Sequence, residues 1–394
     1  MTDYAIVAIG YNRPVSMKRL LVSLENAYYA DDEVDLIISI DNSGADCVEQ
    51  CAAEFIWTHG RKIIKTYEER QGLRKHILNC GDYLNDYRAI AVFEDDVIPS
   101  ESFYQYMKHA VPFYEDDDNI AGISLYNHLW NVNVNMPFQP AYGGSDIYFM
   151  QFAQSWGQIW MKKQWQEFIN WYKTHDEEFG KQDNIPDFVT GWPKTSWLKY
   201  HIKYCIENNK YFVYPYKSLS TCFSDVGEHC SDKDTHLQVP MLCNITTDFR
   251  FSKLNDKDSI VYDAFFERVL SEGELIEGVK AKDVCFDIYG SKTSFDGKKY
   301  LLSRKIMPYK VIRTYGLELR PHEENVIKNI EGEDIFLYSL NEVNKEMMNT
   351  NIKVNKILWL RYTFRIYGKT AVLCKLIADT IKRRLKSKLR WFSR

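Results

Sequence analysis

Three consecutive carboxylates, Glu94, Asp95 and Asp96, follow a short apolar run in the first quarter of the chain. The run at residues 90–93 is apolar and mostly β-preferring, which predicts a buried central strand. Acids at the end of such a strand are costly unless a cation pairs with them. A hard divalent cation takes oxygen ligands and can carry phosphates on its free positions. The turn therefore predicts a cation site, with a solvated acidic turn as the alternative.

A second acidic run, at residues 115–118, serves as a contrast. It follows a helical pattern over residues 104–114 rather than a strand. We therefore expect this run to be a plain solvated loop.

The elements that would position the first acidic turn alternate in type. Predicted strands cover residues 4–10, 34–40, 62–66 and 89–93, and predicted helices cover residues 16–27, 46–57 and 72–87. This order predicts an α/β fold with a parallel, doubly wound sheet. Ligands bind at the carboxyl ends of the strands in such sheets, where Asn12, Arg13 and Asp41 also stand. The sequence contains neither G-x-G-x-x-G nor a Walker lysine loop, so we expect no glycine cradle for phosphates.

The pattern continues more loosely beyond residue 120. We expect a polar, substrate-facing loop at 126–145, an irregular loop at 183–193 and a loop at 220–229 with two acids and an imidazole. Further strands are predicted at residues 120–125, 146–151 and 211–214, and helices at 155–172 and 195–208. Six of the ten tryptophans lie between Trp156 and Trp197, where most should be core and some could carry a sugar ring.

The chain divides into three predicted regions: residues 1–245, an accessory α+β region at 246–350 and a basic tail at 351–394. The accessory region shows strands near 284–288 and 335–338 and helices near 262–270 and 323–330. The last 20 residues hold eight Lys/Arg and one acid, although the whole chain has a net charge of −4. An acidic body with a basic tail argues against a protein that coats nucleic acid.

Leucines and isoleucines recur every four residues in the tail, among basic residues and before Trp391 and Phe392. This pattern predicts a basic amphipathic helix on an anionic membrane surface, or a helix packed on the body. The nine cysteines form no C-x-x-C pair and suit a reducing compartment. The apolar run at residues 5–10 is too short for a signal peptide, so we expect a cytoplasmic body at the inner face of the membrane.

These motifs, taken in order, resemble those of GT-A-fold glycosyltransferases that use nucleotide sugars. The likeness covers residues 4–230 and is strongest to bacterial, family-2-like members related to the N-acetylglucosaminyltransferase I type. It rests on strand–Asn–Arg–Pro, strand–Asp41, strand–Glu–Asp–Asp and Ser–Trp–Gly at 155–157. The resemblance implies a Rossmann-like sheet and a Mn²⁺ or Mg²⁺ cofactor that bridges the donor diphosphate.

The resemblance also implies roles for the acidic turn and the late loop. Asp96 would bind the metal directly, and His229 would contact the metal or the diphosphate. Glu94 and Asp95 would face the donor sugar and the ribose.

Other donor contacts are implied at the remaining strand ends. Asp41 would contact the base and Arg13 the nucleotide, with Arg74 or His76 reaching toward the donor. Trp156 would lie against the donor, most plainly a UDP-sugar.

One departure from the family concerns the catalytic base. Inverting members carry an acid near the place of Lys199, and this chain has none there. Asp225 is then the first candidate and Glu228 the second, with Asp183 and Asp187 behind them.

The leading hypothesis is a metal-dependent, inverting, hexosyltransferase-like enzyme. It would act on a glycan or lipid-linked acceptor in bacterial surface polysaccharide synthesis. The alternatives are a sugar-phosphate nucleotidyltransferase and a non-catalytic relative that binds nucleotide sugars.

Overall fold

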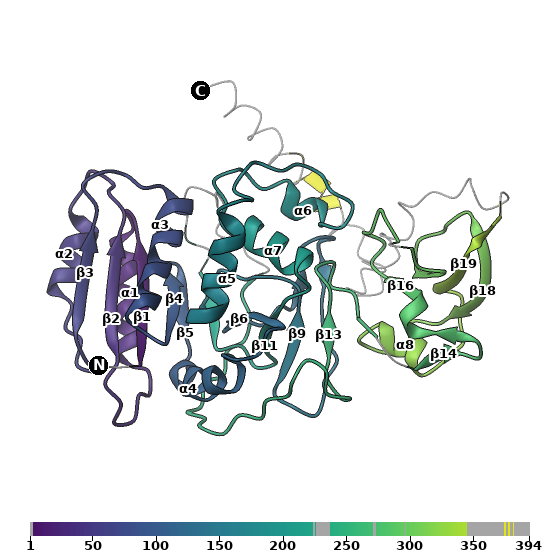
Figure 1. The fold of residues 1–394 in the computed structure, drawn as a ribbon, viewed down its shortest axis with the longest axis horizontal. Helices are drawn as coiled ribbons and strands as arrows, with labels where there is room; N and C mark the ends of the chain where they lie inside the picture. The colour runs from purple at the N-terminus through teal and green to yellow at the C-terminus, as the bar shows by residue number, and fades with distance from the viewer. Residues whose placement is uncertain are drawn as a thin grey trace.

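The computed structural model describes residues 3–223, 225, 237–270, 273–295, 297–344 and, in the tail, 374, 375, 377, 378 and 381. Its main feature is a nine-stranded sheet (Figure 1). The strands are β1 (Tyr4–Gly10), β2 (Asp35–Ile40), β3 (Lys62–Thr66), β4 (Ala89–Glu94), β6 (Ile120–Ser124), β9 (Ile147–Met150), β10 (Gln158–Met161), β11 (Tyr211–Pro215) and β13 (Val261–Tyr262). They are arranged in the order β13-β9-β11-β6-β10-β4-β1-β2-β3.

Six strands of the sheet run in the same direction, namely β3, β2, β1, β4, β6 and β11. Strands β10, β9 and β13 run the other way. The predicted α/β fold with a mostly parallel sheet is therefore confirmed. The chain moves outward from β1 to β3 and then returns to place β4 on the other side of β1. That reversal is the kind of switch point at which ligands bind in open α/β sheets.

Helices cover both faces of the sheet (Figure 1). They are α1 (Pro14–Glu25), α2 (Cys47–Glu54), α3 (Leu73–Cys80), η1 (Gly81–Asn85), α4 (Phe103–Tyr114), α5 (Lys162–Tyr172), α6 (Asp187–Thr190) and α7 (Leu198–Glu207). Alternate residues of β1 enter two different cores: Ile6 packs with α1 and α4, and Val7 packs with α3 and α5. Every residue of β1 is buried for this reason.

Two helix predictions are wrong. The Ser155–Trp160 stretch does not open a helix, because Gly157 turns the chain at φ +93° and β10 follows between β4 and β6. Helix α5 begins only at Lys162. The predicted helix at 262–270 is also absent, since Tyr262 belongs to β13 and Phe266 has a φ of +66°. A short buried strand and a buried helical turn have the same apolar pattern.

The C-terminal part builds a smaller α+β unit around a four-stranded sheet (Figure 1). The sheet order is β16-β17-β19-β18. The elements are β14 (Glu274–Ile276), β15 (Val279–Lys280), η2 (Ala281–Asp283), β16 (Val284–Asp287), β17 (Tyr300–Ser303), β18 (Tyr309–Tyr315), α8 (Glu323–Ile327) and β19 (Ile335–Val343).

Most of the predicted basic tail lies outside the described residues. The five tail residues that are described are helical and exposed. In the part of the chain that the structure describes, no helix combines the length and the apolar character needed to cross a membrane.

Candidate active site

The acidic turn is fixed by a short antiparallel ladder. Strand β5 (Val97–Pro99) leaves the turn and pairs with β12 (Ser220–Cys222). The amide of Phe223 then donates a hydrogen bond to the carbonyl oxygen of Asp96 at 2.7 Å. The ladder therefore brings the segment that carries Asp225 to the ligand-binding edge of the sheet.

Arg13 is the cation that the described residues place against this turn. It stands between β1 and α1, and its Nε lies 3.2 Å from Asp95 Oδ2 while its Nη2 bonds to Asp95 Oδ1. The same Nη2 lies 3.2 Å from Asp96 Oδ2. A planar guanidinium suits such two-pronged pairing with carboxylates.

One arginine does not neutralise three acids. Burial, together with the charges of Asp96 and Asp95, raises the pKa of Glu94 to about 8. Burial also raises the pKa of Asp95 to about 6, although Arg13 opposes that shift. Near pH 7 Glu94 therefore keeps its proton, and full ionisation of the turn calls for more positive charge.

A cavity of about 180 Å³ opens at this edge of the sheet. It is lined by Ile9, Gly10, Tyr11, Asn12, Arg13, Asp41, Arg70, Leu73, His76, Glu94, Asp95, Asp96 and Asp225. The structure thus brings together seven of the site residues proposed from the sequence: five stand at the ends of β1, β2 and β4, His76 stands on α3, and Asp225 follows β12. The cavity lies at the switch point between β1 and β4.

Asp41 is buried beneath a loop that crosses the end of β2. Its Oδ1 accepts hydrogen bonds from the amides of Asn42 and Gln71 at 2.9 and 2.6 Å. Its Oδ2 accepts one from the amide of Gly72 at 2.9 Å. Asp41 therefore anchors the loop that leads into α3, and it still borders the cavity, where a base could be bound.

His76 borders the cavity as a neutral ring. Its Nε2 shares a 2.8 Å hydrogen bond with Ser39 Oγ, and Tyr67 packs against the ring. Burial lowers the pKa of His76 to about 4, although Asp41 opposes the shift. At neutral pH the ring therefore brings no charge to a diphosphate.

Arg70 is a cavity residue that the sequence interpretation missed. Its guanidinium lies 4.9 Å from the centre of the Tyr11 ring, so the two residues line one wall together. In the sequence, Arg70 stands two residues before Gly72, and this position could have indicated a cation near a helix start. In the structure, Gly72 has a φ of +74° and directly precedes α3. A cation in a loop that approaches a helix start is a reasonable phosphate contact.

Asp225 is held in place by helix α1. Ser16 Oγ donates a hydrogen bond to Asp225 Oδ2 at 2.8 Å, and Arg19 Nη2 pairs with the same oxygen. The guanidinium of Arg19 also lies 3.5 Å from the centre of the Phe223 ring. Burial opposes ionisation, but the bonds from Arg19 and Ser16 outweigh it and hold the pKa of Asp225 below its usual range. The group is thus a positioned negative charge and only a weak proton acceptor.

We expect Asp225→Asn to lower kcat by about 10²-fold, as for loss of a charged group that contacts the transition state or accepts its proton, with little change in donor KM. Steady-state kinetics against donor and acceptor would measure both, with the exposed Asp46→Asn as the matched control. An unchanged kcat in both Asp225→Asn and Glu228→Gln would exclude these two acids as the base.

The remaining proposed residues lie away from the cavity or outside the described residues. Arg74 points toward α5 and α7, where it donates to Tyr172, Tyr200 and the carbonyl of Asp176. Trp156 packs on Tyr126, with ring centres 4.9 Å apart. Glu228 and His229 lie outside the described part of the chain.

The two fallback acids are engaged elsewhere. Asp183 accepts a hydrogen bond from Thr293 in the C-terminal unit at 2.9 Å. Asp187 pairs with Lys181 at 3.0 Å on the surface. Neither borders the cavity.

Lys199 stands near the position at which inverting members of the family carry an acid. The structure shows what the lysine does there instead. The side chain is 1% exposed, and its Nζ donates to the carbonyls of Phe179, Thr190 and Trp192 at 3.2, 3.5 and 3.0 Å. This buried cation fastens the 179–192 loop to α7. The position is structural, and an acid there would face carbonyl oxygens.

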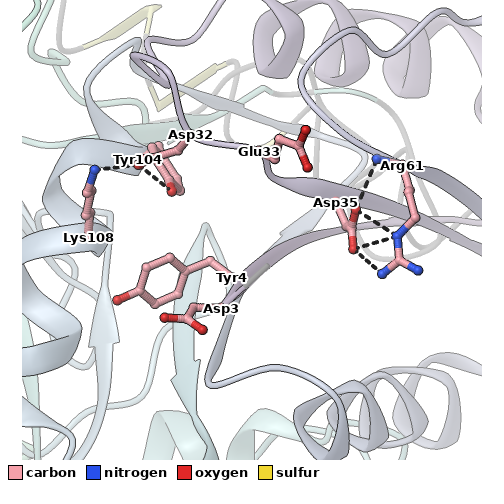
Figure 2. A pocket seen from close by; sticks show the side chains of 8 residues that line it. All are labelled: Asp3, Tyr4, Asp32, Glu33, Asp35, Arg61, Tyr104 and Lys108. Atoms are coloured by element: carbon pink, nitrogen blue, oxygen red, sulfur yellow. Dashed lines mark hydrogen bonds and ion pairs between the residues drawn. The ribbon is translucent and has the colours of Figure 1, made fainter. Parts of the chain in front are cut away.

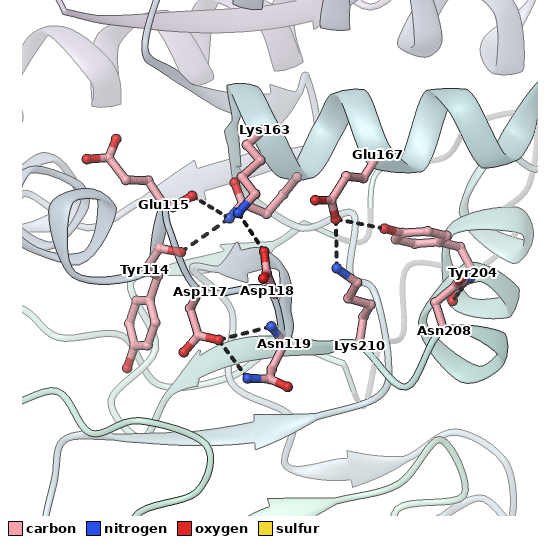
Figure 3. Close-up of polar contacts among 11 residues, drawn as sticks. Tyr114, Glu115, Asp117, Asp118, Asn119, Lys163, Glu167, Tyr204, Asn208 and Lys210 are labelled. Atoms are coloured by element: carbon pink, nitrogen blue, oxygen red, sulfur yellow. Dashed lines mark hydrogen bonds and ion pairs between the residues drawn. The ribbon is translucent and has the colours of Figure 1, made fainter.

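The contrasting acidic run is not a plain solvated loop (Figure 3). Glu115 pairs with Arg88. Figure 3 shows the ion pair of Asp118 with Lys163 of α5, which lie 2.5 Å apart. Asp117 accepts hydrogen bonds from the amide and side chain of Asn119. These contacts join the end of α4 to α5 and to Arg88, just before β4.

A larger, open cavity of about 630 Å³ lies at the opposite edge, near the amino ends of β1 and β2 (Figure 2). Two of its acids already have partners: Asp35 pairs with Arg61, and Asp32 pairs with Lys108 and Tyr104. It lies at the wrong edge for ligands of a doubly wound sheet. Size alone does not make it the functional site.

Comparison with solved structures gives distant likenesses. No protein-family model matches the chain, and no curated protein does. Solved structures that resemble it include the mannosyltransferase PcManGT from Pyrobaculum calidifontis in complex with GDP-Man and Mn²⁺, at 12% identity and a TM-score of 0.31 over 48% of this chain and 50% of that one. They also include S. aureus TarS 1-349, at 14% identity and a TM-score of 0.33 over 56% of this chain and 60% of that one.

TarS 1-349 in complex with UDP-GlcNAc gives 12% identity and a TM-score of 0.33, over 60% of this chain and 62% of that one. The matched part thus spans less than two thirds of each of these structures. Such likenesses are too distant to carry a function, which depends here on the cavity's own residues.

Proposed function

We propose that the chain is a GT-A-type glycosyltransferase that takes a sugar from a nucleotide-diphosphate donor. The observation that carries this proposal is the composition of the cavity at the switch point. Five carboxyl groups and two guanidinium groups line it, so with Glu94 protonated the lining has a formal charge of −2 before any donor arrives. A diphosphate adds further negative charge, so binding requires a cation between the acids and the phosphates.

The residues present fit Mn²⁺ or Mg²⁺ as that cation. Such ions are commonly held by one or two carboxylates, with substrate phosphates and water completing the shell. Asp96 offers a partly exposed carboxylate, and Asp95 lies beside it. Among the described residues no three metal-binding side chains converge, so substrate phosphates and water would have to complete the shell. A bound ion would stabilise the charge of the leaving diphosphate.

The chain's own residues would then divide the remaining tasks. Arg13 orients the two aspartates, Asp225 is a positioned charge beside them, and Asp41 borders the place of the base. A carboxylate there can accept the N3–H of a pyrimidine, which favours a UDP-sugar. Glu94 and Asp95 would face the sugar and the ribose.

Two other functions stay in view. A nucleotidyltransferase needs free basic groups for a triphosphate, whereas Arg13 is engaged by Asp95 and Asp96. A non-catalytic relative is favoured by one observation, the buried cation at Lys199 where inverting enzymes carry an acid. A measurement of turnover would separate the non-catalytic relative from the glycosyltransferase.

The direct test is donor cleavage by the full chain with Mn²⁺, with and without EDTA. We expect slow hydrolysis of one UDP-sugar in the presence of Mn²⁺, and loss of that activity with EDTA. Thermal shift over a panel of nucleotide sugars would identify the donor. Stabilisation by a purine nucleotide sugar above every UDP-sugar would overturn the pyrimidine assignment, and binding without turnover would favour the non-catalytic relative.

We also propose that the tail holds the enzyme at the inner, cytoplasmic face of a membrane, near a lipid-linked acceptor for surface polysaccharide. Ile377 and Ile381 are one helical turn apart and are 53% and 54% exposed. Each basic residue near an anionic leaflet contributes about 1 kcal/mol. An exposed apolar face among basic residues is typical of a helix that lies on a membrane surface.

We expect the full chain to co-sediment with liposomes that contain anionic lipid, and a chain truncated after Ala371 to stay in solution. Binding should weaken as salt is raised, because charge attraction is screened. Liposomes of neutral lipid are the control. Equal binding by both chains, or binding that ignores salt, would contradict the proposal.

A further inference from the structure

One aromatic side chain is displayed to solvent from a loop at the ligand-binding edge. Tyr142 is 82% exposed, and no other large hydrophobic side chain among the described residues exposes as much. The loop also contains the small pair β7 (Trp130–Asn131) and β8 (Met136–Pro137). A single exposed aromatic needs no explanation by itself, so its surroundings decide whether it has a role.

The backbone on both sides of Tyr142 is held by two tyrosine hydroxyls, one from the buried Tyr262 and one from the partly buried Tyr216. The amide of Ala141 donates to the Tyr262 hydroxyl at 2.8 Å, and the amide of Gly143 donates to the Tyr216 hydroxyl at 3.1 Å. A side chain at Gly143 would come within 2.7 Å of the carbonyl of Asp258, so the close approach of the loop requires glycine. The exposed ring therefore stands on an ordered backbone, and a ligand need not order it.

The ring also continues a column of tyrosines that rises from the core. The ring centres of Tyr142 and Tyr216 are 4.9 Å apart, and Tyr216 stacks on Tyr148 at 5.3 Å. Tyr148 in turn stacks on Tyr214 at 5.3 Å. Tyr142 is the exposed end of this column, supported from beneath by packed rings.

The column stands at the same edge as the acidic turn. Tyr216 directly follows the carboxyl end of β11, which is parallel to β4 and three places away in the sheet, or roughly 14 Å at the usual strand spacing. The chain from Tyr216 to Phe223, whose amide bonds to Asp96, spans about 25 Å at most. One extended oligosaccharide could reach both places.

We propose that Tyr142, supported by Tyr216, is a binding platform for a sugar ring of the acceptor glycan, removed from the point of transfer. A sugar presents an apolar C–H face that packs on aromatic surface, while its hydroxyls stay in water. This inference rests on the proposed glycosyltransferase function, which supplies the reason for a glycan at this edge. A neutral oligosaccharide suits the platform better than a protein partner, which would need a far larger apolar area.

The test uses the full chain on immobilised tetrasaccharides of neutral hexoses and N-acetylhexosamines. The variants are Tyr142→Ala, Tyr142→Trp and the control Tyr28→Ala, which removes a partly exposed tyrosine near the opposite edge. We expect Tyr142→Ala to weaken glycan retention by about tenfold, and Tyr142→Trp and Tyr28→Ala to keep it. UDP-sugar hydrolysis should be equal in all four proteins.

Equal retention by the wild type and Tyr142→Ala, or no retention by the wild type, would overturn the platform. Loss of retention in Tyr142→Trp as well would also overturn it, because that variant keeps an aromatic face. Failure of the proposed function would give a different result: the wild type would neither bind nor hydrolyse any nucleotide sugar. The two failures are therefore distinguishable.

Discussion

Asp96→Ala should lower sugar transfer by about 10²–10³-fold while the protein stays folded, because a Lewis acid contributes several kcal/mol to such a step. The substitution removes the carboxylate oxygen that lies 3.2 Å from Arg13 Nη2. Arg13 keeps both of its bonds to Asp95, so the turn keeps its counter-ion. Transfer rates and Mn²⁺ affinity, measured on the same preparation, would show the two losses together.

The matched control is Asp118→Ala in the second acidic run, where the carboxylate meets only the exposed Lys163. That variant should keep full activity, since exposed ion pairs contribute little. Full activity of Asp96→Ala in EDTA would show that no metal acts through this turn.

Lys199→Glu should destabilise the fold by about 3–5 kcal/mol, because it exchanges a bonded buried cation for an uncompensated buried charge. The glutamate would stand against three carbonyl oxygens that now accept hydrogen bonds from Nζ. A loss of this size is a large part of the usual stability of a domain. Urea unfolding followed by fluorescence would report it as a lower midpoint.

Lys194→Glu makes the same change of charge on an exposed residue of the neighbouring loop and should leave the midpoint nearly unchanged. If Lys199→Glu unfolds at the wild-type midpoint, the lysine does not fasten the loop. If that variant also transfers sugar faster, the position is catalytic after all.

The acidic turn and its sheet could be predicted because both follow from local patterns. Carboxyl ends of parallel strands share one edge, so residues after β1, β2 and β4 had to meet. Arg13, Asp41 and Asp96 were found for this reason. The first four parallel strands could be predicted from the sequence as well, because each strand alternates with a helix.

The missed features depend on contacts that no local pattern contains. Strand β10 has four residues and is inserted between β4 and β6, which only its partners can reveal. The bond from Ser16 to Asp225 joins residues 209 apart in sequence. Arg74 was placed near the donor from its helix, although its partners on α5 and α7 turn it away.

The cavity's contacts differ widely in the length of chain they require. Arg13 meets Asp95 across 82 residues, whereas Ser16 meets Asp225 across 209. Synthesis delivers the chain from its amino end, and contacts of short sequence separation close first. The acids of the turn can thus receive their arginine while more than half of the chain is still to be made. The wall that carries Asp225 can close only after β11 and β12 have emerged, so the unfinished protein would hold an open cleft whose acids are only partly compensated by Arg13.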